Sequence, residues 1–238
     1  MPWSQYSHLK LKALGPAYIQ QAFVWAHEAD PQAKLFYNDY NDEALGPKSD
    51  AVYNLLRHLK ARGVPIDGIG LQSHFLVEHP PDFNDIAVNL KRLAALGLEI
   101  HVTELDASMP MPPNKEHLQQ QAKIYRYYLN ECLSISNCKA FVMWGFTDKY
   151  SWIPKYMPGE GAALPFGKTY SPKPAYFALF DTLSKDIQWH SLLTIKSDSV
   201  LGLFKSLISG EHGPNAKALA SLNYSRIVHR TLSNSSAE

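Results

Sequence analysis

The chain has 238 residues, of which 45% are hydrophobic and 19% charged, and its formal net charge is +1. A chain of this length and composition can bury a substantial core, and so small a charge gives no electrostatic reason to expect nucleic acid or an anionic membrane as a partner. No apolar stretch approaches the roughly 20 residues of a membrane-spanning helix, and the N-terminal "MPWSQYSHLK" does not predict a signal peptide.

Strand and helix patterns alternate along most of the chain. Helical segments repeat apolar residues at i, i+3, i+4 and i+7, whereas strand segments are short apolar or aromatic runs. In chain order the sequence predicts a helix over 16–29, a strand over 33–41, a helix around 52–59, a strand over 66–75, a helix around 86–93, a strand over 98–105, a helix around 118–129, a strand over 140–146 and a helix within 171–183. This alternation predicts an α/β fold with a parallel sheet.

Polar residues able to do chemistry gather at the C-terminal end of each predicted strand. They are Asn38 and Tyr40, Gln72 and His74, Glu104 and Asp106, and Trp144 and Asp148. Active sites are built at that end of a (β/α)8 barrel, and open doubly wound sheets also bind ligands there. Because no phosphate-binding glycine loop is present, we favour a TIM barrel, although four strands make only half of one.

The segment 185–238 does not continue this alternation. It is serine-rich, and apolar residues at 200, 203, 204 and 207 suit one amphipathic helix, followed by an end that we expect to be disordered. We therefore divide the chain into a barrel segment, 1–184, and a C-terminal tail, 185–238.

The segment "LEIHVTELDAS" ends an apolar strand with two carboxylates, Glu104 and Asp106. Side chains two apart on a strand share a face, so both are expected to enter one cavity, as are Gln72 and His74. An Asp106–His74–Glu104 arrangement would hold Glu104 ionised as a nucleophile. The alternative is a salt-bridged strand end without chemistry. His101 has the opposite parity and is expected to face the helices.

Aromatic residues also lie at or just after the strand ends: Tyr40, Trp144, Tyr150 and Trp152. Flat rings beside carboxylates and amides suit a carbohydrate ligand. The ten histidines show no metal-ligand spacing, and no Gly-x-Ser-x-Gly motif is present, so we predict neither a metal nor another cofactor. Cys132 and Cys138 are either free thiols or a small disulfide loop, and the loop would indicate an oxidising compartment.

Five segments together resemble glycoside hydrolase family 10, the endo-β-1,4-xylanases. They are "LFYNDYN" (35–41), "IDGIGLQSHF" (66–75), "VTELD" (102–106), "WGFTDKYSWIP" (144–154) and "LPFGKTYSPKPAYFAL" (164–179). Their order and spacing also agree with the family, and "MPWSQY" resembles the family's segment just after its fourth strand.

The resemblance implies retaining hydrolysis of β-1,4-xylosidic bonds in xylan or xylo-oligosaccharides. By position, Glu104 matches the nucleophile, and His74 and Asp106 match the pair that hold it. The residues that match the lining of the sugar subsites are Tyr40, Gln72, Trp144 and Trp152, and Asn38 matches a family position of less certain role. The cysteine pair resembles a disulfide found in many members, which are mostly secreted, so the resemblance also implies an extracellular protein.

The same comparison implies that the chain corresponds to about the last four strands of the barrel. The family's acid/base glutamate lies in an Asn-Glu pair at the end of strand four, and no such pair precedes "YNDYN". Because general acid catalysis contributes about 10²–10⁴-fold, we expect little or no activity from the chain by itself. Three alternatives stay open: a non-catalytic carbohydrate-binding half-barrel, one half of a split enzyme completed by an N-terminal half-barrel, and, more remotely, a metal-dependent barrel hydrolase.

Overall fold

The computed structural model describes residue 15 and residues 17–194, with side chains as far as residue 185. The elements are α2 (Tyr18–Ala29), β1 (Phe36–Asp39), α3 (Pro47–Ala61), β2 (Gly68–Leu71), β3 (His74–Leu76), α4 (Phe83–Ala95), β4 (Glu99–Pro110), α5 (Lys115–Ser134), β5 (Cys138–Met143), the 3-10 helix η1 (Asp148–Tyr150), α6 (Ile153–Tyr156), β6 (Glu160–Gly161) and α7 (Pro174–Thr194). The helix expected near 200–207 lies outside the described residues, and α7 continues past residue 184.

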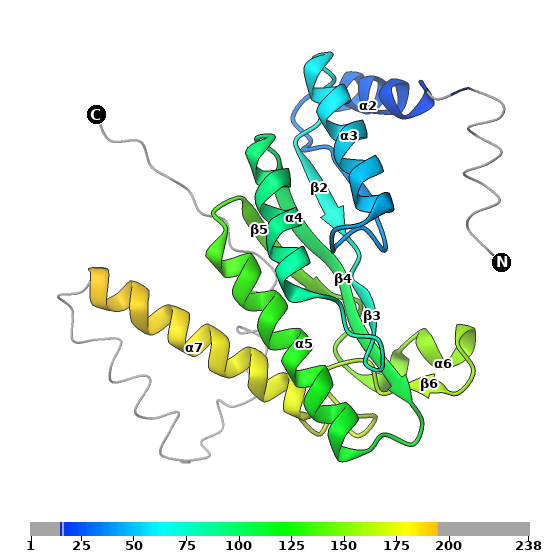
Figure 1. The fold of residues 1–238 in the computed structure, drawn as a ribbon, viewed down its shortest axis with the longest axis vertical. Helices are drawn as coiled ribbons and strands as arrows, with labels where there is room; N and C mark the ends of the chain where they lie inside the picture. The colour runs from blue at the N-terminus through cyan, green and yellow to red at the C-terminus, as the bar shows by residue number, and fades with distance from the viewer. Residues whose placement is uncertain (1–14, 16, 195–238) are drawn as a thin grey trace.

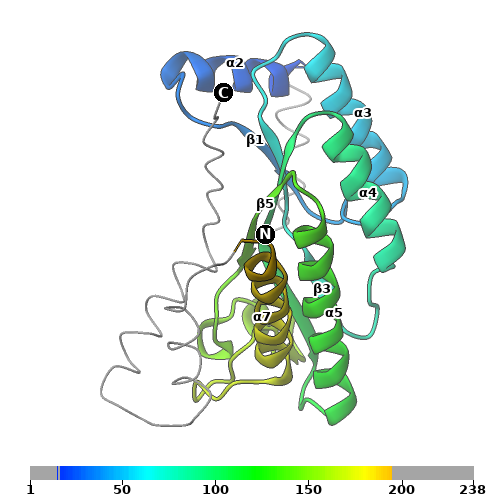
Figure 2. The ribbon, with the colours of Figure 1, turned by 90° about the vertical axis from the view of Figure 1, so that its left-hand side faces the viewer.

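A parallel sheet connects these elements in the order β1–β2–β4–β5. Farther along β4, β3 pairs with it in parallel, and β6 pairs antiparallel with its end. Helices α3, α4 and α5 cover one face of the sheet, as the two views in Figure 1 and Figure 2 show. The predicted α/β fold with a parallel sheet is confirmed.

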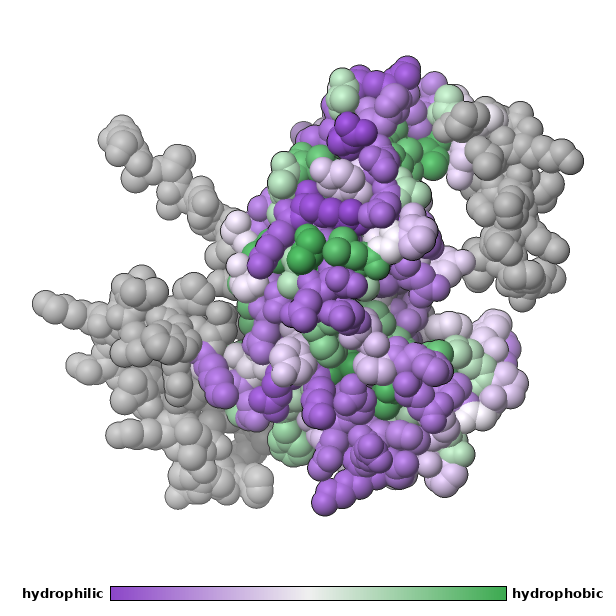
Figure 3. Space-filling model, viewed as in Figure 1, coloured by the Kyte–Doolittle hydropathy of each residue, from purple (hydrophilic) through white to green (hydrophobic). Residues whose placement is uncertain are grey.

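The hydrophobic core lies between the sheet and these helices. Its fully buried residues include Leu56 of α3, Ile86 and Leu90 of α4, Ile124 and Tyr128 of α5, and Ile69, Leu71, Ile100, Val102 and Leu105 of the strands. Burial of each such side chain contributes about 1.5–3 kcal/mol. The outer side of the helices is mostly hydrophilic, with scattered apolar areas (Figure 3). Within the described residues, no helix is both long and apolar enough to cross a membrane.

The opposite side of the sheet, here called the open face, carries Phe36, Asn38, His101 and Thr103. Strand register places Asn38 beside Gly70, and Gly70 beside His101, so these three residues point to the same side. The His101 ring stacks on Phe36 with centroids 4.1 Å apart. The expectation that His101 faces the helices is therefore wrong.

A bulge in β4 explains this error. Ile100 and Val102 are buried on the helix side, and so are Leu105 and Ala107, which leaves two residues between the buried sets instead of one. The pairing of β4 with β5 shifts register between Val102 and Leu105. An extra residue of this kind redirects the side chains that follow it. Glu104 reaches the open face because of the bulge, which the parity count did not include.

The strand predicted over 66–75 is also interrupted. β2 ends at Leu71 and β3 begins at His74, and Ser73 between them has a φ of 66°. A left-handed conformation is uncommon for a residue other than glycine, and it cannot continue a regular strand. Gln72 and His74 are therefore not two positions of one pleated strand.

Gly68 makes room for Phe36 on the open face. A Cβ atom at residue 68 would lie 2.1 Å from Phe36 Cε1 and 2.6 Å from the backbone oxygen of Glu99. Gly68→Ala is therefore expected to lower the free energy of unfolding by about 1–3 kcal/mol, measured by urea denaturation. Gly46→Ala is the matched control, because its Cβ would meet no atom within 4 Å. Equal losses in the two variants would contradict this packing.

Candidate active site

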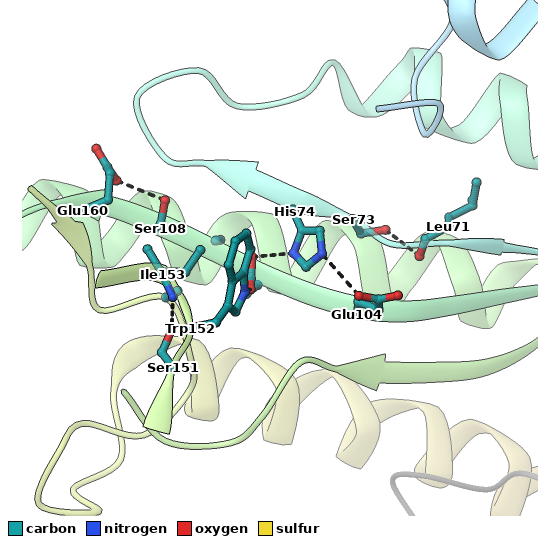
Figure 4. A network of polar contacts seen from close by, with 12 residues as sticks. Leu71, Ser73, His74, Glu104, Ser108, Ser151, Trp152, Ile153 and Glu160 are labelled. Carbon is teal, nitrogen blue, oxygen red and sulfur yellow. Dashed lines mark hydrogen bonds and ion pairs between the residues drawn. The ribbon is translucent and has the colours of Figure 1, made fainter. Parts of the chain in front are cut away.

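His74 connects the two acids of β4, and Figure 4 shows its contact with Glu104. Its Nδ1 atom lies 2.9 Å from Asp106 Oδ1, and its Nε2 atom lies 3.4 Å from Glu104 Oε2. The β3–β4 register puts His74 directly opposite Asp106, and the bulge brings Glu104 to the same side. The structure thus brings together the three residues that the sequence predicted as a cluster.

The two acids change the protonation of His74. Burial lowers the pKa of the imidazole, but the hydrogen bond and charge of Asp106, together with the charge of Glu104, raise it more, so the pKa lies above its ordinary 6.5. A protonated imidazole donates from both ring nitrogens. Both carboxylates can then act as acceptors, and these contacts fix the orientation of the Glu104 side chain.

Asp106 is fully engaged as an acceptor. Its side chain is buried, with 1% exposure, and its Oδ2 atom accepts a hydrogen bond from Trp152 Nε1 at 2.8 Å. The Trp152 ring also meets the His74 ring edge-on, with centroids 5.3 Å apart. Trp152 was expected to line a sugar subsite, and its contacts show that it also anchors the His74–Asp106 pair.

Asn38 holds the other side of Glu104. Its Nδ2 atom donates to Glu104 Oε1 at 3.0 Å, and its Oδ1 atom accepts from Thr103 Oγ1 at 2.8 Å. A residue of uncertain role in the sequence is therefore a direct partner of the central carboxylate. Thr103, which sequence reasoning missed, reaches Asn38 from the same face of β4 as His101.

The remaining predicted residues follow the ends of β1, β2 and β5. Trp144 follows β5, is 51% exposed, and donates its backbone N–H to Leu105 O at 3.1 Å, next to Glu104. Tyr40 is 45% exposed, and Lys48 Nζ lies 3.9 Å from its ring centroid. Gln72 is half-buried, and its backbone N–H donates to Asp39 O. Exposed rings beside a carboxylate can stack on an apolar sugar face.

Asp148 stands apart from the cluster, although it also follows a predicted strand. Its carboxylate accepts from the Leu164 backbone and from Lys173 Nζ, both at 2.9 Å. Lys173 donates in addition to Ala162 O. Asp148 therefore ties together the loops after β5, and position at a strand end alone did not distinguish it from Glu104.

Two adjacent buried acids, Asp42 and Glu43, lie in the loop after β1. Glu43 Oε1 accepts from the Ser73 backbone N–H at 2.7 Å, whereas neither carboxylate oxygen of Asp42 has a hydrogen-bond partner among the described residues. Asn89 fixes the loop by donating to both backbone carbonyls. No local sequence pattern signals that either of these loop acids is buried.

A disulfide joins Cys132 at the end of α5 to Cys138 at the start of β5. Of the two possibilities left open by the sequence, the structure contains the disulfide. In the described part of the chain, no group of three or more His, Cys, Asp or Glu side chains is arranged to hold a metal ion.

Comparisons with known proteins agree with this fold. The model of glycosyl hydrolase family 10 matches residues 5–182. Endo-1,4-beta-xylanase B of Thermotoga neapolitana is 43% identical over 178 residues, which cover 74% of this chain and 51% of the relative. The structure of xylanase 10B from Thermotoga petrophila in complex with xylobiose has a TM-score of 0.72 and 44% identity, covering 75% of this chain and 54% of that one. The intracellular xylanase TsXylA from Thermoanaerobacterium saccharolyticum has a TM-score of 0.65 and 41% identity, covering 71% and 51%.

The matches place the chain among the glycosyl hydrolases by descent, and it covers about half of each of these solved structures. It belongs to glycosyl hydrolase family 10. The chain spans about half the length of the curated relatives it matches, 51% for the Thermotoga neapolitana enzyme. The resemblance seen in the sequence is confirmed at the level of the family.

Removal of the indole N–H of Trp152 should reveal its anchoring role. Trp152→Phe leaves Asp106 Oδ2 buried without this donor, and such a loss costs about 1–3 kcal/mol of unfolding free energy. Trp144→Phe is the matched control. That side chain is half exposed, so this variant should lose much less unfolding free energy. Urea denaturation of both variants measures the difference. Equal destabilisation would contradict the role of the Trp152–Asp106 hydrogen bond.

The buried Asp42 carboxyl should make stability depend on pH. Burial, with the nearby charges of Glu43 and Asp39, raises its pKa from 3.8 to about 7. The folded chain then keeps a proton that the unfolded chain releases, so this group's contribution to stability is lost as the pH rises from about 4 to 7. Asp42→Asn removes the titration.

We expect Asp42→Asn to gain stability relative to the natural chain as the pH rises from 4 to 7, with no further gain above that range. Urea midpoints of both proteins at pH 4.5, 6 and 8 measure this difference directly, because the other titrating groups are common to both. A difference that stays constant with pH would contradict the buried, unpaired state of Asp42.

Proposed function

We propose that Glu104 is the nucleophile of a retaining endo-1,4-β-xylanase site, with xylan or xylo-oligosaccharides as substrate. The observation that supports it is the fixed position of the Glu104 carboxylate, between the Asn38 amide at 3.0 Å and His74 at 3.4 Å. The substrate class is supported by relatives named endo-1,4-beta-xylanase and by the relative whose structure holds xylobiose.

In this mechanism a Glu104 oxygen attacks the anomeric carbon, and the glycosidic C–O bond breaks. The leaving oxygen takes a proton from a second carboxyl group, which lies about 5–5.5 Å from the nucleophile in retaining enzymes. The second group, now a carboxylate, removes a proton from a water molecule. That water attacks the anomeric carbon and releases Glu104. His74 and Asn38 keep Glu104 aligned through both steps.

Asp106 is a poor candidate for the second carboxyl group. Both of its oxygens already accept hydrogen bonds, from His74 and Trp152, and the side chain is buried. The hydrogen-bonded cluster around Glu104 holds no other carboxylate within the described residues. We infer that the acid/base residue comes from a segment beyond residues 17–194, in the same chain or in a second one.

The edges of the sheet offer places for such a segment. Among the described strands, β1 pairs with β2 alone and β5 with β4 alone, so each has a free edge. A free parallel edge is a template for another strand. On α7, Phe177 and Phe180 are 51% and 53% exposed. A half-barrel that pairs with both edges would close the sheet and complete the site.

The purified 238-residue chain is expected to release little or no xylo-oligosaccharide from xylan. Addition of a polypeptide with the first half of a family 10 barrel should raise the rate by about 10²-fold or more, because it restores general acid catalysis. Glu104→Gln should abolish this gain, whereas Glu28→Gln, an exposed residue of α2, should leave it intact. Reducing-sugar release measures both.

Two outcomes would count against parts of this proposal. Undiminished turnover in Glu104→Gln would exclude Glu104 as the nucleophile. Robust turnover by the chain on its own, lost in Glu104→Gln, would keep the nucleophile and overturn the inference about the second carboxyl group.

A second candidate function is carbohydrate binding without hydrolysis. The half-exposed rings of Tyr40 and Trp144, which follow the ends of β1 and β5, favour it, since stacking does not require an acid. Calorimetric titration with xylohexaose distinguishes the two functions. Binding that survives Glu104→Gln, with no hydrolysis in the complemented mixture, would support this alternative.

We also propose an extracellular, oxidising location. The Cys132–Cys138 disulfide supports it, because such bonds persist mainly in oxidising compartments. The relative described as intracellular indicates that location varies within the family. Thiol labelling of the chain isolated from its source would show two free thiols if the proposal is wrong.

A further inference from the structure

Ser73 has a conformation that needs support. Its φ of 66° is left-handed, its side chain is fully buried, and His74 follows it directly. A residue other than glycine in this region is strained by about 1–3 kcal/mol and persists only where surrounding contacts hold it. The contacts of Ser73 therefore determine where the His74 imidazole lies.

Those contacts reach into three parts of the structure. The Ser73 backbone N–H donates to Glu43 Oε1 at 2.7 Å, and its carbonyl accepts from the Asp106 N–H at 3.3 Å. Its Oγ atom donates to Leu71 O at 3.1 Å and lies 2.9 Å from the Tyr128 hydroxyl. Among these contacts, the one with Glu43 is made by an acidic side chain from another loop.

Glu43 is well placed for this contact. Its side chain is buried, with 4% exposure, and Asn89 Nδ2 holds its backbone carbonyl at 2.9 Å. Burial raises the pKa of Glu43 above its ordinary value, although the hydrogen bonds from its own and the Ser73 backbone, and the charges of His74 and Lys48, offset part of this rise. A carboxylate that accepts from an N–H forms a stronger hydrogen bond than a neutral acceptor.

We propose that Glu43 is a positioning residue, which holds Ser73 in its left-handed conformation and thereby sets the His74 imidazole between Asp106 and Glu104. Its meaning for catalysis rests on the proposed function of Glu104. Glu43 contacts no substrate in this account and takes no part in proton transfer. It acts from the helix side of the sheet, whereas the cluster that it positions reaches the open face.

The test follows the His74 imidazole by NMR in the full 238-residue chain. Glu43→Ala removes the acceptor, so His74 should move away from its two acids and its pKa should fall by about half a unit or more. Glu43→Gln keeps an acceptor oxygen but no charge, and should give a smaller fall. Glu28→Ala, on the exposed side of α2, is the control and should change nothing.

A rescue variant separates positioning from general destabilisation. Glycine adopts φ near 66° without strain, so Ser73→Gly in the Glu43→Ala background should restore most of the His74 pKa. An unchanged His74 pKa in Glu43→Ala, or a fall that Ser73→Gly does not reduce, would overturn the proposal. If Glu43→Ala does not fold, the same comparison in the Glu43→Gln background decides.

These measurements need no hydrolysis. If Glu104 fails as a nucleophile while the His74 pKa responds as expected, the proposed function falls and the positioning role stands. If Glu104 is the nucleophile and the His74 pKa does not change in the Glu43 variants, the proposed function stands and the positioning role falls.

Discussion

His74 must reach Asp106 through one ring nitrogen and Glu104 through the other, and this double contact constrains much of the surrounding backbone. It requires β3 to pair with the second half of β4, in the register that sets His74 opposite Asp106. It also requires the bulge that turns Glu104 toward the open face, and the left-handed Ser73 that separates β3 from β2. Each irregularity of the sheet near the site thus serves a polar contact, while the regular parts of the same strands pack against helices.

The two faces of the sheet have different roles, one in packing and the other in forming the site. The helix side is a continuous apolar core, and it stabilises the strands. The open face carries Asn38, Thr103 and the Glu104 carboxylate. Asp42, Glu43, Ser73 and Asn89 form a buried polar group joined by hydrogen bonds, and Ser73 directly precedes His74. A buried acid without a hydrogen-bond partner lowers stability, and Asp42 is such an acid within the described residues, so the presence of this group next to His74 is an indication of function.

Much of this could be predicted from the sequence because periodicity records which residues are buried. The alternation of strands and helices, and the gathering of Glu104, His74 and Asp106, follow from hydrophobic pattern and the position of strand ends. The bulge at Thr103–Glu104 and the turn at Ser73 could not be predicted, since each depends on hydrogen bonds between segments far apart in the chain. The same limit explains why His101 was assigned to the wrong face, and why Glu43 and Trp152 gained partners that no local motif indicates.

The central claim is that Glu104, held by His74, is the group that attacks the sugar. A 2-fluoro-xylobioside with a dinitrophenyl leaving group tests it most directly, because this leaving group needs no proton and the fluorine slows release of the bound sugar. The reagent is incubated with the 238-residue chain, alone and with a complementing half-barrel, and the labelled peptide is identified by mass spectrometry. The account predicts one sugar on Glu104. A label on Asp106 or any other carboxylate, or no label in the complemented mixture, would contradict it.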